Sequence, residues 1–352
     1  MFTWSEDPYK DMWNHLKFLG KVNNARRLLI GDIKSNRQIV YSDGLEAEKK
    51  AKQISMCINQ ADEYFQAANL ASINTSPLLF FYGMLSLSKA LIVANKPGIS
   101  LEEIQYHGLH TRPQYEHLRT YKENPLNWSM EEEYALTNGG VFRYLTEILD
   151  GFVFEDNTLF RFKDILSVCA EISGMYEKFY NDRSQILNLF SHTIETEPKY
   201  SITICSREKD KSEVISRIPE LAIDFTMSEE LKHGKARIFI SKDLTKFPDY
   251  LGLYNSNFGG RYIVGGVNYF HNTTINRKHL NPASLDYVAM FILSICVRYK
   301  HDFWGTVVEG NRSGVLGLIE LFISVIKRRF PNTILDNLFG EEFRYGSPGY
   351  IT

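Results

Sequence analysis

The sequence contains few cysteines, little net charge and none of the short motifs that mark the commonest catalytic sites. Only four of its 352 residues are cysteines, and they lie far apart: Cys57, Cys169, Cys205 and Cys296. This dispersal argues against a disulfide framework or a cysteine-based metal site, and it predicts free thiols in a reducing compartment. The formal net charge is −2, so no overall field favours nucleic acid or anionic lipid.

Several classes of enzyme lack their signature here. There is no Gly-x-Ser-x-Gly motif and no legible Cys/His dyad. The glycine-rich run at 259–266 lacks the Gly-Lys-Ser/Thr ending of a phosphate-binding loop and is typical of a turn, a strand and a bend. The first residues show no basic segment followed by an apolar one, so we expect no secretory signal and a cytoplasmic location. We predict no cofactor.

The strongest structural pattern lies in residues 43–96, which predict two long helices folded into a hairpin. Asp43 with Glu46 three residues later is typical of a capping box. The first helix then places apolar residues at alternating spacings of four and three: Ala47, Ala51, Ile54, Ile58, Ala61, Phe65 and Ala68. Ser76 and Pro77 begin the second helix, and Pro97-Gly98 ends it.

The second helix is long and apolar enough to raise the question of a membrane span. Lys89 lies inside it, together with Gly83 and two serines, and no asymmetric charged loops flank it. A helix that is apolar on most sides within a large soluble protein is a central core helix. We therefore predict a buried hairpin and no membrane association.

The rest of the chain changes from helical to alternating patterns and back. Further helices are predicted at 142–149, 162–180, 281–300 and 313–329, the last ending before Pro331. Alternation predicts strands of one antiparallel sheet at 200–205, 236–241 and 261–264. The predicted fold is mainly α (α+β): a helical bundle built on the hairpin, with a small antiparallel β insertion. Its predicted regions are 1–195, 196–275 and 276–352.

Several segments resemble the YaaC-like protein family. They are the run Ser76 to Met84, His107-Gly108 followed by Arg112, the late helix at Phe291 to Ser294 with Arg298-Tyr299 and Trp304, and the closing segments 338–341 and 343–348. The similarity covers nearly the whole chain. Most of these segments are hydrophobic helix signatures, so the resemblance implies a bacterial, intracellular protein and no particular activity or catalytic residue.

The densest group of functional side chains is His107, His110, Arg112 and His117. A His-x-x-His spacing does not place two imidazoles on one helical face, and no cysteine or carboxylate follows at metal-ligand spacing. We therefore predict no metal site. We expect a structured loop in which His107 and Arg112 donate to backbone carbonyls of the helices that they cover. His107 and His110 are candidates for a ligand or interaction loop.

An alternative assigns catalysis to Arg112 and His117. Their Arg-x4-His spacing is similar to that of HEPN ribonucleases, in which an arginine can hold the scissile phosphate and a histidine can move the proton of the 2′-hydroxyl. This sequence departs from that motif because Pro113 follows the arginine directly and because the motif comes soon after the hairpin. The alternative reading is a metal-independent ribonuclease.

A second candidate interaction loop joins the last two predicted helices. Within it, Glu309 and Arg312 can pair with each other or face a ligand. Together the patterns predict a cytoplasmic protein that acts through a protein partner, with nucleic acid and a second copy of the chain as further candidates. A non-catalytic subunit of a regulatory or antiphage defence assembly is the setting that we expect by analogy.

Overall fold

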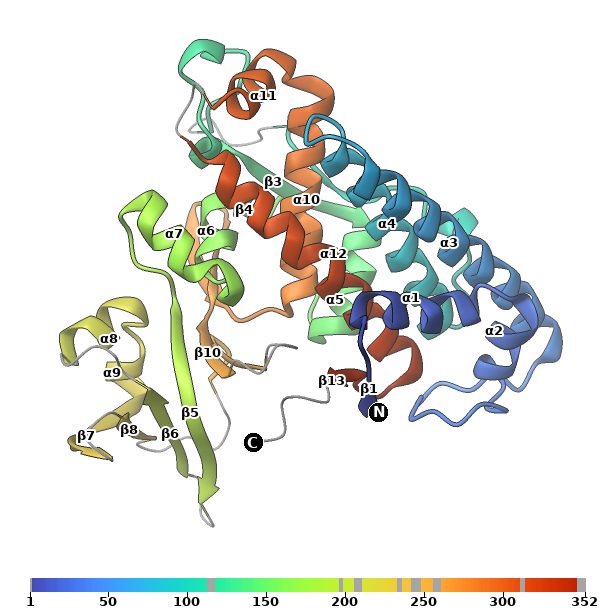
Figure 1. Ribbon diagram of the computed structural model, residues 1–352, viewed down its shortest axis with the longest axis horizontal. Coiled ribbons are helices and arrows are strands. Elements are labelled where there is room, and N and C mark those ends of the chain that lie inside the picture. Colours follow the sequence, from blue (N-terminus) through green and yellow to red (C-terminus); the bar gives the residue numbers. More distant parts are fainter. Residues whose placement is uncertain are drawn as a thin grey trace. The chain divides into compact units, whose positions relative to one another are not determined.

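A computed structural model describes residues 2–112, 118–195, 199–205, 211–232, 236–241, 248–255, 261–310 and 314–346 of the protein. The chain divides into two compact units. Unit 1 comprises residues 1–159 and 281–352, and unit 2 comprises residues 160–280. Unit 1 is mainly helical, whereas the largest sheet belongs to unit 2 (Figure 1). The fold is therefore α+β with a helical majority, as the sequence predicts.

Unit 1 contains two parts of the chain that are far apart in sequence. Its helices are α1 (Pro8–Leu19), α2 (Val22–Leu29), α3 (Gly44–Leu70), α4 (Ser76–Asn95), α5 (Val141–Asp150), α10 (Pro282–Tyr299), α11 (His301–Val308) and α12 (Leu316–Phe339). Its strands include β2 (His107–His110), which pairs antiparallel with β3 (Tyr134–Gly140), and β1 (Phe2–Trp4), which pairs parallel with β13 (Arg344–Gly346).

The predicted hairpin is present as α3 and α4, which lie side by side in Figure 1. The carboxylate of Asp43 caps α3 by accepting from the backbone N–H of Leu45 at 2.9 Å. The predicted capping box is incomplete, because the carboxylate of Glu46 accepts from the backbone N–H of Gly98 at 3.1 Å. Glu46 therefore ties the start of α3 to the turn that follows α4.

Helix α4 is the central helix of unit 1. It contacts α3, α5, α10 and α12, and Phe81 is fully buried between aromatic rings of Tyr287 and Phe291 at centroid distances of 5.5 and 5.6 Å. Among the described residues, α4 and α10 are each long and apolar enough to cross a membrane. In each helix, 78% of the apolar 18-residue stretch is buried inside the protein. Such burial is what core helices show.

The C-terminal helices differ from the prediction in two ways. The segment expected to be a loop after residue 300 forms α11, and α12 continues through Pro331 to Phe339. Proline removes one backbone N–H from a helix. Here the helix is held on both sides of the proline by apolar side chains that are buried in unit 1: Phe330, Ile334, Leu335 and Leu338. Tertiary burial therefore outweighs the local stop signal.

Unit 2 is built around one antiparallel sheet of six strands in the order β7-β8-β6-β5-β10-β9. These are β5 (Ile186–Glu195), β6 (Lys199–Cys205), β7 (Phe225–Lys232), β8 (Ala236–Ser241), β9 (Leu251–Asn255) and β10 (Arg261–Gly265). The three predicted strands are confirmed in it as β6, β8 and β10. The unit also contains a hairpin of β11 (Val267–His271) and β12 (Thr274–Lys278). It begins within strand β4 (Leu159–Arg161).

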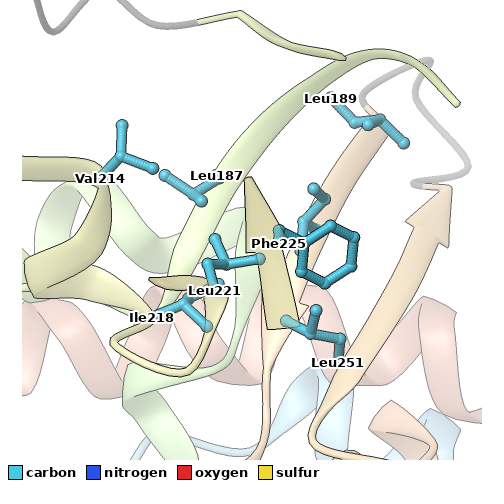
Figure 2. Packing of buried hydrophobic residues seen from close by; sticks show 8 residues of the cluster. Leu187, Leu189, Val214, Ile218, Leu221, Phe225 and Leu251 are labelled. Atoms are coloured by element: carbon cyan, nitrogen blue, oxygen red, sulfur yellow. The ribbon is translucent and has the colours of Figure 1, made fainter. Parts of the chain in front are cut away.

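The core of unit 2 lies between the sheet and the helices α8 (Lys211–Arg217) and α9 (Leu221–Asp224). Figure 2 shows its side chains converging from these helices and from strands of the sheet. The members are Leu187, Leu189, Val214, Ile218, Leu221, Phe225, Leu251 and Ile263. This cluster has no counterpart in the sequence prediction, because its helices are too short to show a clear period.

The helix predicted at 162–180 is wrong, since the segment forms α6 (Phe162–Ser167) and α7 (Ser173–Tyr180). The carbonyl of Ser167 accepts from Gln185, at the start of β5, instead of continuing the helix. Both helices belong to unit 2, where Glu177 of α7 pairs with Arg217 of α8. The β-rich unit therefore begins at residue 160, before the predicted boundary at 196.

Candidate functional site: a half-buried cationic cluster

His110 is held by hydrogen bonds on both sides of its ring. Its Nδ1 accepts from the backbone N–H of Arg112 at 3.2 Å, and its Nε2 lies 3.2 Å from the side-chain oxygen of Asn157. The first contact requires an unprotonated Nδ1, so Nε2 carries the proton and donates to Asn157. Burial is the main cause of a lowered pKa for His110. The ring is therefore neutral and serves to fix the end of β2.

Of the predicted site residues outside the two histidines of β2, the structure describes Arg112 and Glu309. Arg112 is exposed and follows β2 outside any helix. Glu309 is exposed at the C-terminal end of α11. His117 and Arg312 lie outside the described residues. The Arg112–His117 pair and the Glu309–Arg312 pair therefore stay predictions.

His107 occupies a different environment, on strand β2 where the sequence predicts a loop. The backbone adopts a φ of +82° at Gly108, and the pairing of β2 with β3 shifts its register there. Such irregularities turn side chains away from their regular direction. The carbonyl of His107 accepts from the hydroxyl of Tyr287 at 2.9 Å. Strand, bulge and α10 thus fix the position of the imidazole together.

The imidazole of His107 packs against aromatic rings on its inner side. Its centroid lies 5.5 Å from that of Phe81 and 6.4 Å from that of Phe291. The Nδ1 atom is buried and has no hydrogen-bond partner. An unpaired buried acceptor is tolerated better than an unpaired buried N–H, so in the neutral ring we place the proton on Nε2. That N–H is then available to an anionic ligand.

Two cations lie close to this imidazole. The pKa of His107 is lowered, first by burial and then by the positive charges of Arg298 and Lys89. Lys89 comes from α4 and Arg298 from the end of α10, and both are half-buried. Within the part of the chain that the structure describes, neither cation has a carboxylate partner. The positive charges of Lys89 and Arg298 therefore act on His107, and no described carboxylate is paired with either cation. We call these three residues the cationic cluster.

Hydrogen bonds hold the Arg298 side chain in place without using all of its N–H donors. Its guanidinium donates to the carbonyl and the hydroxyl of Ser294 at 3.2 Å each and to the hydroxyl of Tyr82 at 3.4 Å. A guanidinium has five N–H groups, so N–H donors remain for a ligand. Its planar fork suits the paired oxygens of a phosphate or carboxylate. Partly buried like charges repel each other strongly, and an anion bound between them would relieve that repulsion.

Tyrosine rings lie beside Arg298. Tyr64 of α3 stacks on Tyr82 of α4 with centroids 5.7 Å apart and an interplanar angle of 27°. The guanidinium of Arg298 lies over the ring of Tyr82 at 5.9 Å and over that of Tyr299 at 5.1 Å. The site can therefore bind an anionic group and offers aromatic surface beside it. No group of metal-ligating side chains occurs among the described residues.

Sequence reasoning identified His107 but not its neighbours. In the sequence patterns, Lys89 serves only as a charge that argues against a membrane helix. Arg298-Tyr299 serves only as part of the resemblance to the YaaC-like family. A usable signal was present, because a lysine within an otherwise apolar helix and an arginine near the end of another apolar helix are both costly to bury unless they serve a purpose. The pairing of α4 with α10 that joins them is a contact between segments far apart in sequence.

Comparisons with other proteins place the chain in a family. No curated protein and no solved structure matches this sequence. The sequence model of the YaaC-like Protein family matches residues 17–338, which include the whole of unit 2, most of unit 1 and every residue of the cationic cluster. The match confirms the resemblance carried by the helix signatures of α4 and α10, and the chain belongs to the YaaC-like protein family.

Proposed function

We propose that this protein is a cytoplasmic binding protein that recognises the phosphate groups of nucleic acid at the cationic cluster. One observation carries the proposal: the positive charges of Lys89 and Arg298 both act on His107 in unit 1, and neither of these permanent cations has a carboxylate partner among the described residues. Each of the three supplies N–H donors that match phosphate oxygens. Nucleic acid is the partner in which such groups recur along a chain.

Binding without cleavage is the role that this site supports best. A ribonuclease needs a base and an acid placed within hydrogen-bond reach of the reacting oxygens. In the cluster, the only titratable base is His107, and its Nδ1 is buried away from any ligand. In a regulatory or antiphage assembly, the protein would recognise nucleic acid and leave the chemistry to a protein partner.

The salt dependence of binding tests the proposal. Fluorescence anisotropy with a short labelled oligoribonucleotide gives the dissociation constant at several salt concentrations. Each phosphate contact contributes about −0.7 to the slope of log K against log salt concentration for a single strand. We expect Lys89→Gln to weaken binding and to make the slope shallower by about 0.7, and Arg298→Gln to act in the same direction.

Lys52→Gln is the matched control, because Lys52 is exposed on α3 and already pairs with Glu48 at 3.4 Å. It should leave affinity and slope unchanged. RNA recovered after incubation without divalent metal should be intact. Equal affinity and slope for Lys89→Gln and wild type would contradict the proposal, and RNA with 2′,3′-cyclic phosphate ends would favour the HEPN-like ribonuclease instead.

A further inference from the structure

The aromatic rings beside the cationic cluster form a continuous stack with Arg298. Tyr64 stacks on Tyr82, Arg298 lies over Tyr82, and the same guanidinium lies over Tyr299. The three rings and the guanidinium come from α3, α4 and α10. We call this arrangement the tyrosine–arginine stack. Ser294 holds the arginine in it through two hydrogen bonds.

The outer end of the stack is open. Tyr299 is 66% exposed, although the guanidinium of Arg298 lies over its ring. The other members are half-buried. A cation over one face of an aromatic ring leaves the opposite face free for a flat partner, and the ring is already ordered by the cation–π contact. Tyr299 is thus an ordered aromatic surface that no described side chain is shown to stack upon.

Arg298 belongs to both the stack and the cationic cluster. A ligand that fits both must carry an anionic group next to a flat, unsaturated ring. A nucleotide with an unpaired base has this combination, since its base can stack on an aromatic side chain while its phosphate meets the cations. In a duplex the faces of the bases are covered by their neighbours, and a phosphorylated peptide offers the phosphate alone.

We propose that the site binds single-stranded nucleic acid, with an unpaired base stacked on the open face of Tyr299 and the adjacent phosphate held by Lys89, His107 and Arg298. This inference rests on the proposed function and specifies its ligand. It makes Tyr299 a binding residue that contributes through its ring, independently of charge.

The test separates the contribution of the base from that of the phosphates. Anisotropy is measured with three labelled ligands of equal length: an adenine-rich single strand, the same strand with abasic positions, and a duplex. Stacking of one base predicts a loss of roughly five- to hundred-fold in affinity when either the bases or the ring of Tyr299 are removed. Tyr299→Leu and the abasic strand should therefore give similar losses, and their combination little more than either.

Two variants sharpen the result. Tyr299→Trp should restore or strengthen binding, because it keeps a flat ring. Tyr106→Leu is the matched control, since Tyr106 is an exposed tyrosine at 72% and is assigned to no ring stack; it should bind as the wild type does. Both substitutions are at exposed positions, and an unchanged melting temperature shows that the fold is intact.

The outcomes distinguish the two proposals. If the abasic strand binds as tightly as the adenine-rich strand, the base-stacking inference is wrong and the phosphate site stands. If the duplex binds more tightly than the single strand, the inference is also wrong. If no ligand binds with a salt-dependent affinity, both proposals are wrong.

Discussion

Two glycines of unit 1 share a backbone conformation but differ in their surroundings. Gly108 has a φ of +82° and Gly98 a φ of +77°. A Cβ atom at residue 108 would lie 2.6 Å from the backbone nitrogen of Phe142, whereas nothing lies within 4 Å of one at residue 98. The two positions therefore separate the cost of conformation from the cost of a clash with backbone.

We expect Gly98→Ala to lower the free energy of unfolding by about 1–2 kcal/mol, which is the cost of a left-handed conformation for a residue with a Cβ. Gly108→Ala should cost more, because the backbone of α5 must also move. It should also weaken RNA binding, since the bulge at Gly108 sets the direction of His107. Thermal melts and anisotropy measure the two effects. Equal costs for both variants would show that α5 yields easily.

The protonation of His107 gives the site a pH dependence. Burial, Arg298 and Lys89 lower its pKa in the free protein. A bound phosphate adds negative charge beside the ring and raises that pKa, so binding takes up a proton. Affinity should therefore increase as pH falls from 8 toward 6, and decrease as pH rises.

Phosphodiesters do not titrate in this range, so a change of affinity with pH reports on the protein. We expect His107→Gln to bind with an affinity that varies little between pH 6 and 8. The groups around the ring that carry charge are Lys89 on α4 and Arg298 on α10. Wild-type binding that is independent of pH would place the phosphate away from His107.

At the scale of elements, a buried ion pair joins α10 to α12. Asp286 is fully buried and accepts from Arg329, through Nε at 3.0 Å and through a terminal nitrogen at 2.5 Å. Removing one member of a buried ion pair costs about 3–5 kcal/mol. Replacing both by apolar residues of similar volume is often neutral or stabilising.

We therefore expect Arg329→Met to lower the free energy of unfolding by about 3–5 kcal/mol. Adding Asp286→Leu should restore most of that loss, and denaturant unfolding of the four proteins in the double-mutant cycle measures the coupling. Additive losses would mean that the pair does not couple the two helices. Because neither residue belongs to the cationic cluster, the double variant should still bind RNA.

The helices that sequence predicts best are those whose signals are local. The caps of α3 and the apolar seam from Ala47 to Ala68 lie within one helix, so they are readable without knowledge of the fold. Pro331 shows the opposite case, since its local signal to stop is overruled by burial on both sides. The break between α6 and α7 depends on Gln185, which is distant in sequence from α6.

The same division applies to the candidate site. The sequence indicates His107 because other histidines and an arginine lie near it along the chain. Its partners Lys89 and Arg298 come from two helices separated by most of the chain, and only the packing of α4 against α10 brings them together. No spacing rule along the sequence reports such a juxtaposition.

At the scale of the whole molecule, the cysteines report on compartment and packing. Cys57, Cys169 and Cys296 are free thiols and buried, and the side chain of Cys205 lies outside those that the structure describes. Burial raises the pKa of Cys57 to about 11 and that of Cys296 well above its usual value. Both thiols are therefore protonated and shielded at neutral pH.

We expect these three thiols to stay unreactive toward a thiol reagent in the native protein and to react fully after denaturation. Intact-mass analysis of labelled protein counts them in each state. Rapid labelling of Cys57 in the native protein would show that α3 separates from α4. A disulfide in freshly purified protein would contradict the proposed cytoplasmic location.

Unit 1 is made from two separate parts of the chain, and this separation affects how it folds during synthesis on the ribosome. Helix α4 ends at Asn95, but α10, which covers it, begins at Pro282, after the whole of unit 2. At about 5–20 residues per second, the ribosome needs roughly ten to forty seconds to make the intervening chain. During that time the apolar helix α4 has been made but α10, which packs against it, has not. Unit 2 is continuous in sequence, so its synthesis is complete before that of unit 1. The apolar surface of α4 is thus exposed to chaperones for a long time in the nascent chain. Slower translation of residues 160–280 should therefore increase aggregation of the newly made protein.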